Sequence, residues 1–235
     1  MENYYSGNPP IVDVLIPAVD EEESIGKVIA EVPPFVRRIV VVNNGSRDRT
    51  AEVAAESGAW VVNEPKKGYG QACLTGITYL KQQEVAPDIL VFLDGDYSDF
   101  PEQLFEVIHP ILMEGKDLVI GSRALGTKEA GSMTFPQVFG NWLSITLMRW
   151  IYGTAYTDLG PFRAIRWQSL LELGMEDRSY GWTIEMQIKA AKKGMKAAEV
   201  PVNYRRRIGV SKVSGTVRGV FGAGYKILWT IWKYR

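Results

Sequence analysis

The chain has 235 residues, and 46% of them are hydrophobic, which suits one globular α/β domain with a sizeable core. Its 27 basic and 27 acidic side chains balance, so its overall charge argues against a nucleic acid partner. Cys73 is its one cysteine, which excludes an internal disulfide and fits a reducing compartment. No apolar run reaches the roughly 20 residues of a membrane-spanning helix, and residues 1–10 lack the apolar core of a signal peptide. We therefore expect a cytoplasmic protein without a transmembrane segment.

Strand and helix patterns alternate along the first half of the chain. Apolar runs rich in β-branched residues predict strands, and the segments between them start and stop as helices do. This alternation predicts a largely parallel sheet with right-handed crossovers, flanked by helices, in a single domain over residues 1–235. The expected strands cover 12–17, 38–45, 59–63, 88–96 and 117–121, and the expected helices cover 20–31, 50–57, 70–83 and 101–114.

The second half has a less regular pattern and ends in an aromatic helix. The C-terminal stretch 213–235 is rich in Trp, Tyr and Lys, a composition that suits a membrane interface. The same aromatic residues would also suit packing within a core or against another subunit. The sequence leaves peripheral membrane contact and a homo-oligomer equally open. The expected elements are a helix over 136–152, a strand over 160–165, a helix over 180–193, a strand over 196–204 and a helix over 217–234.

Two acids separated by glycine follow the apolar strand that begins at residue 88. Asp94 and Asp96 would project to one face of that strand about 6–7 Å apart, because successive side chains alternate. Two like charges held there repel each other, and a divalent cation that bridges them to a diphosphate would relieve the repulsion. Pro17 and the pair Asn43-Asn44 end two other strands, and ligands of such sheets bind beyond the carboxyl ends of strands. We therefore expect one crevice at three strand ends, although an isolated Asp-x-Asp also occurs as two solvated acids.

Other classes of protein use similar loops. Gly68-Tyr69-Gly70 precedes a helix and could hold an anion at its N-terminus, but a dinucleotide-binding fingerprint should follow the first strand. A sugar-nucleotide pyrophosphorylase would carry a glycine-rich signature after that strand, where this chain has proline and acids. A phosphatase of the haloacid dehalogenase type has Asp-x-Asp on its first strand, whereas three strand–helix units precede Asp94 here. The phosphatase stays as an alternative, as does a non-catalytic nucleotide-binding module, which Asn43-Asn44 suggests.

Eight short motifs occur in order between about residues 12 and 212. Each is common alone, but the ordered set is specific, and with it the chain resembles the inverting glycosyltransferases of family 2. The resemblance is greatest to the branch of dolichyl-phosphate mannose synthases and polyprenyl-phosphate glucosyltransferases. It implies a GT-A fold and transfer of a sugar, with inversion, from a UDP- or GDP-sugar to an acceptor. A polyprenyl phosphate is the first choice of acceptor, and a hydroxyl acceptor in polysaccharide or glycolipid synthesis is the alternative. The motifs are IPAVDEEESI (16–25), VVNNGSRDRT (41–50), KKGYGQA (66–72), LDGDYSDFPE (93–102), GSR (121–123), DLGPFR (158–163), YGWTIEMQ (180–187) and VPVNYRRRIGVSK (200–212).

The resemblance also implies roles for individual residues. Asp94 and Asp96 would hold Mg²⁺ or Mn²⁺ on the donor diphosphate together with Ser98, and Asp94 would also contact the ribose. Asp158 would serve at the reaction centre as a base or an orienting carboxylate, and Arg123 would lie beside the acceptor phosphate. The other nucleotide-sugar contacts would come from Pro17, Ala18, Val19, Glu21, Asn43, Lys67, Gly68 and Gly95, and the other acceptor or phosphate contacts from Arg205, Arg206, Arg207 and Lys212.

Two positions depart from the family pattern and leave the donor open. Asn43-Asn44 stand where the family commonly has two aspartates, and asparagine can donate as well as accept hydrogen bonds. Ser98 stands where mannose synthases often carry glutamine, so the sequence does not specify the base or the sugar. The acceptor decides whether a base is needed. A phosphate arrives ionised, whereas a hydroxyl would have to give its proton to Asp158 or Glu185.

Overall fold

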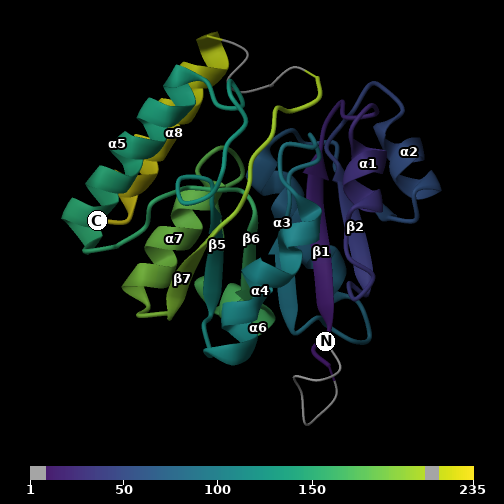
Figure 1. Ribbon diagram of the computed structural model, residues 1–235, viewed down its shortest axis with the longest axis horizontal. Helices are drawn as coiled ribbons and strands as arrows, with labels where there is room; N and C mark the ends of the chain where they lie inside the picture. Colours follow the sequence, from purple (N-terminus) through teal and green to yellow (C-terminus); the bar gives the residue numbers. More distant parts are fainter. Residues whose placement is uncertain (1–8, 210–216) are drawn as a thin grey trace.

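A sheet of seven strands forms the centre of the computed structural model, which describes residues 9–209 and 217–235 (Figure 1). The strand order is β3-β2-β1-β4-β6-β5-β7. Neighbouring strands are parallel, except that β6 is antiparallel to both β4 and β5. The sheet confirms the predicted α/β class and adds an antiparallel strand that the sequence does not indicate. The strands are β1 Val12–Ala18, β2 Arg38–Asn43, β3 Trp60–Asn63, β4 Ile89–Phe92, β5 Leu118–Ser122, β6 Arg163–Arg166 and β7 Ala197–Pro201.

Helices cover both faces of this sheet. The described residues form α1 Ile25–Ala30, α2 Thr50–Glu56, α3 Tyr69–Lys81, α4 Leu104–Met113 with a 3₁₀ turn Pro101–Gln103 before it, α5 Phe135–Tyr152, α6 Trp167–Leu173, α7 Trp182–Lys192 and α8 Val217–Lys233. Residues of α1, α2 and α4 pack into one hydrophobic cluster with one face of the sheet. Residues of α3, α6 and α7 pack into a second cluster on the other face. The strands of the centre are therefore buried on both sides, as their unbroken apolar runs predict.

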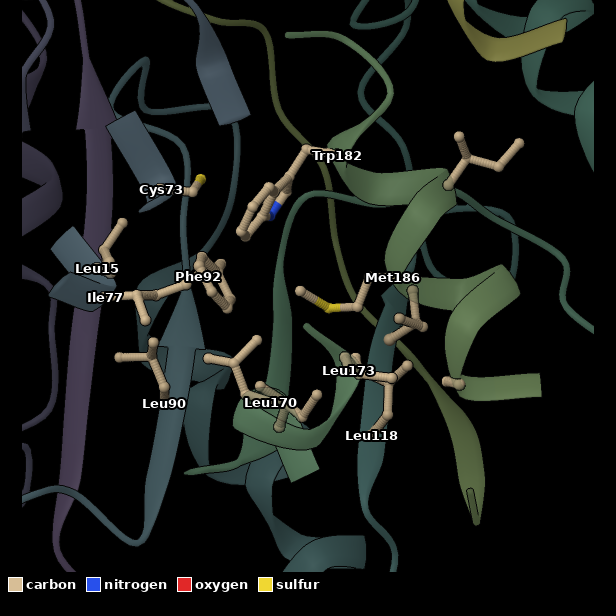
Figure 2. Packing of buried hydrophobic residues seen from close by; sticks show 14 of the residues in the cluster. Leu15, Cys73, Ile77, Leu90, Phe92, Leu118, Leu170, Leu173, Trp182 and Met186 are labelled. Carbon is tan, nitrogen blue, oxygen red and sulfur yellow. The ribbon is translucent and has the colours of Figure 1, made fainter. Parts of the chain in front are cut away.

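Side chains of one strand alternate between the two clusters. In β1, Leu15 packs with α3 on one face, whereas Val14 and Ile16 pack on the other, as the two-residue repeat of a strand requires. Figure 2 shows the cluster that contains Leu15. There the rings of Phe92 on β4 and Trp182 on α7 meet with their centroids 6.0 Å apart. This packing sets the carboxyl end of β4 against the start of α7.

Helices α5 and α8 lie side by side and pack beside α7 (Figure 1). A capping box between Thr134 and Gln137 begins α5, and Gly153 ends it in the left-handed region with φ 66°. Several large apolar side chains of these two helices remain exposed. Among the described residues, no helix combines the length and the apolarity needed to cross a bilayer. The exposed aromatic residues include Phe135, Trp142, Trp150, Tyr225, Trp229 and Trp232.

Some element boundaries differ from those that the sequence predicts. β4 ends at Phe92, so Asp94 and Asp96 lie in the loop that follows and not in the strand itself. That loop turns sharply, and Tyr97 adopts a left-handed φ of 66° within it. β7 ends at Pro201 instead of residue 204, because Pro201 pairs with Ser122, the last residue of the neighbouring strand β5. Helix α6 directly follows β6 and is not predicted from the sequence pattern.

Candidate active site

A cleft of about 620 Å³ opens beyond the carboxyl ends of β4 and β5. Asp94 and Asp96, which follow β4, and Arg123, which follows β5, all line it. This is the end of the sheet at which α/β proteins bind ligands. The cleft draws on both halves of the chain, since its lining also includes Tyr69, Ser132, Thr134, Gln137, Tyr180, Thr183, Tyr204, Arg206 and Arg207.

Asp94 carries a buried carboxylate oxygen that faces a second acid. Its Oδ1 has no hydrogen-bond partner among the described residues. Burial, and after it the negative charge of Asp96, raises the pKa of Asp94 to about 7, although a hydrogen bond from Tyr69 opposes the rise. A divalent cation would favour the ionised form of both acids, so the pair fits such an ion. No group of three or more His, Cys, Asp and Glu side chains in the described part of the chain is placed to hold a metal, so further ligands would come from the substrate or water.

Both carboxylate oxygens of Asp96 have partners. Ser98 donates its backbone N–H at 3.0 Å and its hydroxyl at 2.5 Å to Oδ1, and Arg207 Nη1 lies 3.0 Å from Oδ2. The turn after β4 folds Ser98 beneath Asp96, where Ser98 is fully buried and outside the lining of the cleft. The sequence predicts Ser98 as a metal ligand, whereas this geometry makes it a support for Asp96.

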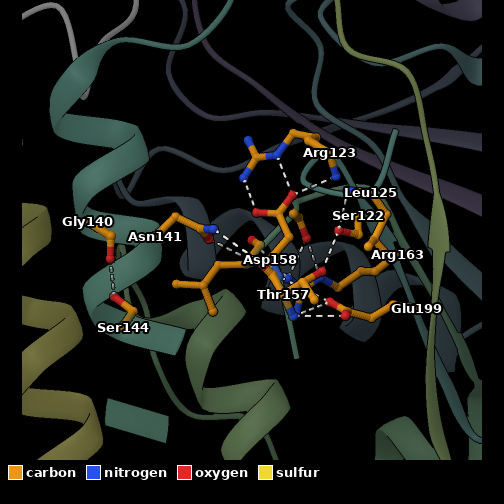
Figure 3. A network of polar contacts seen from close by, with 12 residues as sticks. Ser122, Arg123, Leu125, Gly140, Asn141, Ser144, Thr157, Asp158, Arg163 and Glu199 are labelled. Atoms are coloured by element: carbon orange, nitrogen blue, oxygen red, sulfur yellow. Dashed lines mark hydrogen bonds and ion pairs between the residues drawn. The ribbon is translucent and has the colours of Figure 1, made fainter. Parts of the chain in front are cut away.

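Arg123, which lines the cleft, forms a bidentate ion pair with Asp158, which is buried and lies outside the lining of the cleft (Figure 3). Nε and Nη2 of Arg123 donate to Oδ2 and Oδ1 of Asp158 at 2.8 and 2.7 Å, and the Arg123 backbone N–H donates to Oδ2 at 2.8 Å. Burial alone would raise the pKa of Asp158, but the charge and hydrogen bonds of Arg123 outweigh it and hold that pKa below its ordinary value. Both carboxylate oxygens of Asp158 therefore accept from Arg123, and this pairing fixes the orientation of the guanidinium.

The three arginines at 205–207 have different surroundings. Arg205 donates to the Tyr97 carbonyl at 2.6 Å and pairs with Glu31 at 2.6 Å, and its guanidinium stacks 3.3 Å from the centroid of the Tyr97 ring. It anchors the chain to the turn after β4 and lies outside the lining of the cleft. Arg206 and Arg207 line the cleft, so the structure brings to it two of the three arginines that the sequence predicts there.

Arg207 connects two acids that the sequence places in the site. Its Nη2 lies 2.9 Å from Glu21 Oε1, and its Nη1 lies 3.0 Å from Asp96 Oδ2. Arg206 instead donates its Nε to the Ala130 carbonyl at 2.7 Å. Lys212, the last basic residue in the predicted set, lies outside the described residues.

The strand ends of β1 and β2 lie beside the cleft and do not line it. Asn43 donates to Asn63 Oδ1 at 2.9 Å and accepts from the Ser46 N–H at 3.2 Å. Asn44 is more deeply placed: its amide donates to the Lys66 carbonyl at 2.7 Å and accepts from the Gly68 N–H at 2.8 Å. Asn44 therefore holds the loop that carries Lys67, a role that the sequence does not indicate. Other predicted residues outside the lining of the cleft are Pro17, Ala18, Val19, Glu21, Lys67, Gly68 and Gly95.

Glu185 has a structural role away from the cleft. It is fully buried on α7 and accepts hydrogen bonds from the Asp177 N–H at 2.8 Å and from the Tyr234 hydroxyl at 2.7 Å. Lys189 pairs with it at 2.7 Å. These contacts tie α8 to α7 and correct the expectation that Glu185 could take a proton from a hydroxyl acceptor.

Sequence reasoning missed several residues that line the cleft. Tyr69 belongs to the Gly-Tyr-Gly motif, so its place beside Asp94 could have been inferred from that loop. Thr134 and Gln137 carry the Thr-x-x-Gln pattern of a capping box, which marks the start of α5. Thr183 and Tyr204 lie within the motifs at 180–187 and 200–212, but only the tertiary structure brings them to the cleft.

A family model for glycosyl transferase family 2 matches residues 13–174, which include β1 to β6 and the acids of the cleft. The chain belongs to glycosyltransferase family 2. An uncharacterized glycosyltransferase of Mycobacterium tuberculosis is 37% identical over 215 residues, which cover 88% of this chain and 92% of that relative. A dolichyl-phosphate hexose transferase of Haloferax volcanii is 31% identical over 204 residues, which cover 85% of each protein. These findings confirm the resemblance on which the sequence prediction rests.

Solved structures confirm the GT-A fold of this family 2 member. Glucosyl-3-phosphoglycerate synthase of Mycobacterium tuberculosis, crystallised with Mn²⁺, UDP and phosphoglyceric acid, is similar with a TM-score of 0.75. The match covers 96% of this chain and 78% of that structure at 20% sequence identity. The same synthase has been crystallised with Mg²⁺ and UDP. The topology of the sheet and the family match favour a glycosyltransferase over the phosphatase alternative.

Proposed function

We propose that this family 2 glycosyltransferase moves a sugar, with inversion, from a nucleotide diphospho-sugar to a polyprenyl phosphate. The observation that carries the proposal is the ion pair of Asp158 with Arg123. Both oxygens of Asp158 accept from Arg123, and the pKa of Asp158 is lowered, so it is a weak base for a hydroxyl acceptor. An acceptor phosphate is already ionised and needs no base. The Arg123 guanidinium suits a phosphate, because its donors match phosphate oxygens in pairs.

An apolar groove supports a lipid acceptor over a small polar one. The groove has a volume of about 440 Å³ and runs between α5 and α8, with Phe139, Leu143 and Leu228 in its walls. Arg123 and Leu159 line both this groove and the cleft, so a phosphate at Arg123 could continue into an isoprenoid chain there. Two relatives, a dolichyl-phosphate hexose transferase and a UDP-N-acetylglucosamine–dolichyl-phosphate N-acetylglucosaminyltransferase, have names that point the same way.

We assign the divalent ion, Mg²⁺ or Mn²⁺, to Asp94 and Asp96, because the unpartnered oxygen of Asp94 suits a cation. When bound, the ion would neutralise charge that develops on the leaving diphosphate. Ser98 keeps Asp96 oriented by two hydrogen bonds. Arg207, which pairs with Asp96 and Glu21, would supply positive charge beside the diphosphate. These roles rest on the chain's own contacts and on the Mn²⁺ and UDP bound by the glucosyl-3-phosphoglycerate synthase.

The base and the ribose of the donor would lie over the ends of β1 and β2. Glu21 and Asn43 occupy those ends, beside the backbone of 17–19 and the Lys67-Gly68 loop that Asn44 holds.

Residues 1–235 would form one domain. Exposed aromatic residues on α5 and α8 favour peripheral contact with the inner face of a membrane over contact with a second copy, because neither helix carries an acid that would repel anionic lipid.

Matched acceptors test this proposal. The purified protein is first screened by thermal shift with UDP, GDP, CDP and dTDP, each with and without Mn²⁺, to find the preferred base. Sugar transfer from the matching donor is then measured to a polyprenyl phosphate and to the same polyprenol without phosphate. We expect product with the phosphate alone. Equal transfer to the free polyprenol or to a sugar hydroxyl would refute a phosphate acceptor.

A further inference from the structure

The segment that carries Asp158 has no regular secondary structure, yet side chains from other elements bind its backbone. Glu199 on β7 accepts from the Thr157 N–H at 2.8 Å and from the Asp158 N–H at 3.1 Å. Asn141 on α5 donates its amide to the Thr157 carbonyl at 3.2 Å and accepts from the Leu159 N–H at 2.9 Å (Figure 3). The two residues thus hold this segment from two sides.

The other two carbonyls of the segment are bound in the same way. Gln187 on α7 donates to the Asp158 carbonyl at 3.0 Å, and Arg163 on β6 donates to the Leu159 carbonyl at 3.2 Å. All six backbone polar groups of residues 157–159 therefore have side-chain partners. In helices and sheets, backbone N–H and C=O groups hydrogen-bond to one another. Here the position of Asp158 depends instead on four side chains that belong to four elements.

Asn141 is distinguished from the other three partners by its position. It lies on α5, the helix that forms one wall of the apolar groove, and it lines that groove itself. Its amide spans Asp158, with one bond to the residue before it and one to the residue after it. An amide is required for this, because it supplies a donor and an acceptor from one planar group.

We propose that Asn141 is a positioning residue for sugar transfer: it holds Asp158 so that Asp158 presents the Arg123 guanidinium to the acceptor phosphate. This inference rests on the proposed function, in which Arg123 meets that phosphate. Helix α5, which carries Asn141, also forms a wall of the groove for the isoprenoid chain. It would therefore help to position both the chain of the acceptor and, through Asp158, the Arg123 guanidinium that binds the acceptor phosphate. A displacement of about 1 Å at such a group can reduce turnover roughly 100-fold.

The first test compares Asn141→Ala with a control on the same helix. Thr146→Ala is suitable, because the Thr146 hydroxyl donates only to the Trp142 carbonyl within α5, at 2.8 Å, in the described structure. We expect Asn141→Ala to lower kcat with the acceptor about 10- to 100-fold. Affinity for the nucleotide, measured by calorimetry with Mn²⁺, should stay within about twofold, and Thr146→Ala should leave both quantities unchanged.

A double-mutant cycle separates positioning from a structural role. If Asn141 acts through Arg123, the loss caused by Asn141→Ala should shrink to about threefold or less in an Arg123→Lys background, because the group being positioned has already changed. The same fold loss in both backgrounds would overturn the inference, as would an equal loss in Thr146→Ala. The cycle is run on whichever acceptor the wild-type enzyme uses. Transfer to a hydroxyl acceptor would refute the proposed function, and the cycle on that acceptor would still decide whether Asn141 acts through Arg123.

Discussion

Replacing Asp158 with asparagine tests the ion pair on which the proposed function depends. The side chain of Asp158 is 1% exposed and that of Arg123 is 11% exposed, so the variant leaves a guanidinium with little solvent and no counter-charge from Asp158. Breaking a buried pair by removing one partner costs about 3–5 kcal/mol of the free energy of unfolding. In a domain of this size each kcal/mol lowers the melting temperature by roughly 2–4 °C, so we expect a fall of about 6–20 °C.

The same substitution should lower turnover about 100-fold, which is typical when an oriented charge or donor at a reaction centre is lost. The matched control is Asp13→Asn. Asp13 is fully buried at the start of β1, at the opposite end of the sheet from the cleft, and makes a bidentate pair with Arg37 at 2.9 and 2.6 Å. Arg37 is 29% exposed, so the control should lose somewhat less stability, and its turnover should stay within about twofold of the wild type.

Melting temperature and initial rates on polyprenyl phosphate decide the outcome. Turnover close to wild type in Asp158→Asn would refute the argument that this pair aims Arg123 at the acceptor. An equal loss of turnover in Asp13→Asn would show that instability alone explains the effect. A fall in wild-type turnover on the acidic side of the pH profile that is absent in Asp158→Asn would instead assign Asp158 the role of a base.

Three further predictions concern the metal, the backbone and acid stability. Asp96→Ala should abolish the strengthening of UDP binding by Mn²⁺ in calorimetry, and unchanged affinity would remove the metal assignment. Gly70→Ala should lower the melting temperature by several degrees, because its Cβ would lie 2.0 Å from the Asp177 carbonyl oxygen, whereas Gly224→Ala on α8 meets nothing within 4 Å and should not lower it. Because the pKa of Asp158 is lowered in the folded protein, ionised Asp158 stabilises the fold at pH values above its ordinary pKa of 3.8. This stabilisation is lost as the pH falls through the pKa that Asp158 has in the folded protein. In urea unfolding, the stability difference between wild type and Asp158→Asn should therefore shrink below about pH 4, and a constant difference would contradict the pairing.

Much of the fold follows from local pattern. The apolar runs ending near Pro17, Asn43 and Phe92 predict parallel strands buried on both faces, because only strands covered by helices on both sides can be apolar throughout. The same pattern places Asp94 and Asp96 at a carboxyl strand end, and they do line the cleft. The alternating helices and the start of the C-terminal helix were likewise readable from periodicity, since burial repeats every two or 3.6 residues.

The chemistry of the site depends on contacts between residues far apart in the chain. β6 inserts between β4 and β5 in the antiparallel direction, and the segment before it brings Asp158 to Arg123, 35 residues earlier. The sequence by itself therefore determined the layers of the molecule and the strand end at which the cleft opens, and it predicts the acids that would hold a metal. Tertiary structure alone decided which partner each charge has: Arg205 with Glu31, Arg207 with Asp96, and Asp158 with Arg123. The physical reason is that periodicity reports how deeply a residue is buried, whereas the partner of a buried charge depends on which distant elements pack beside it.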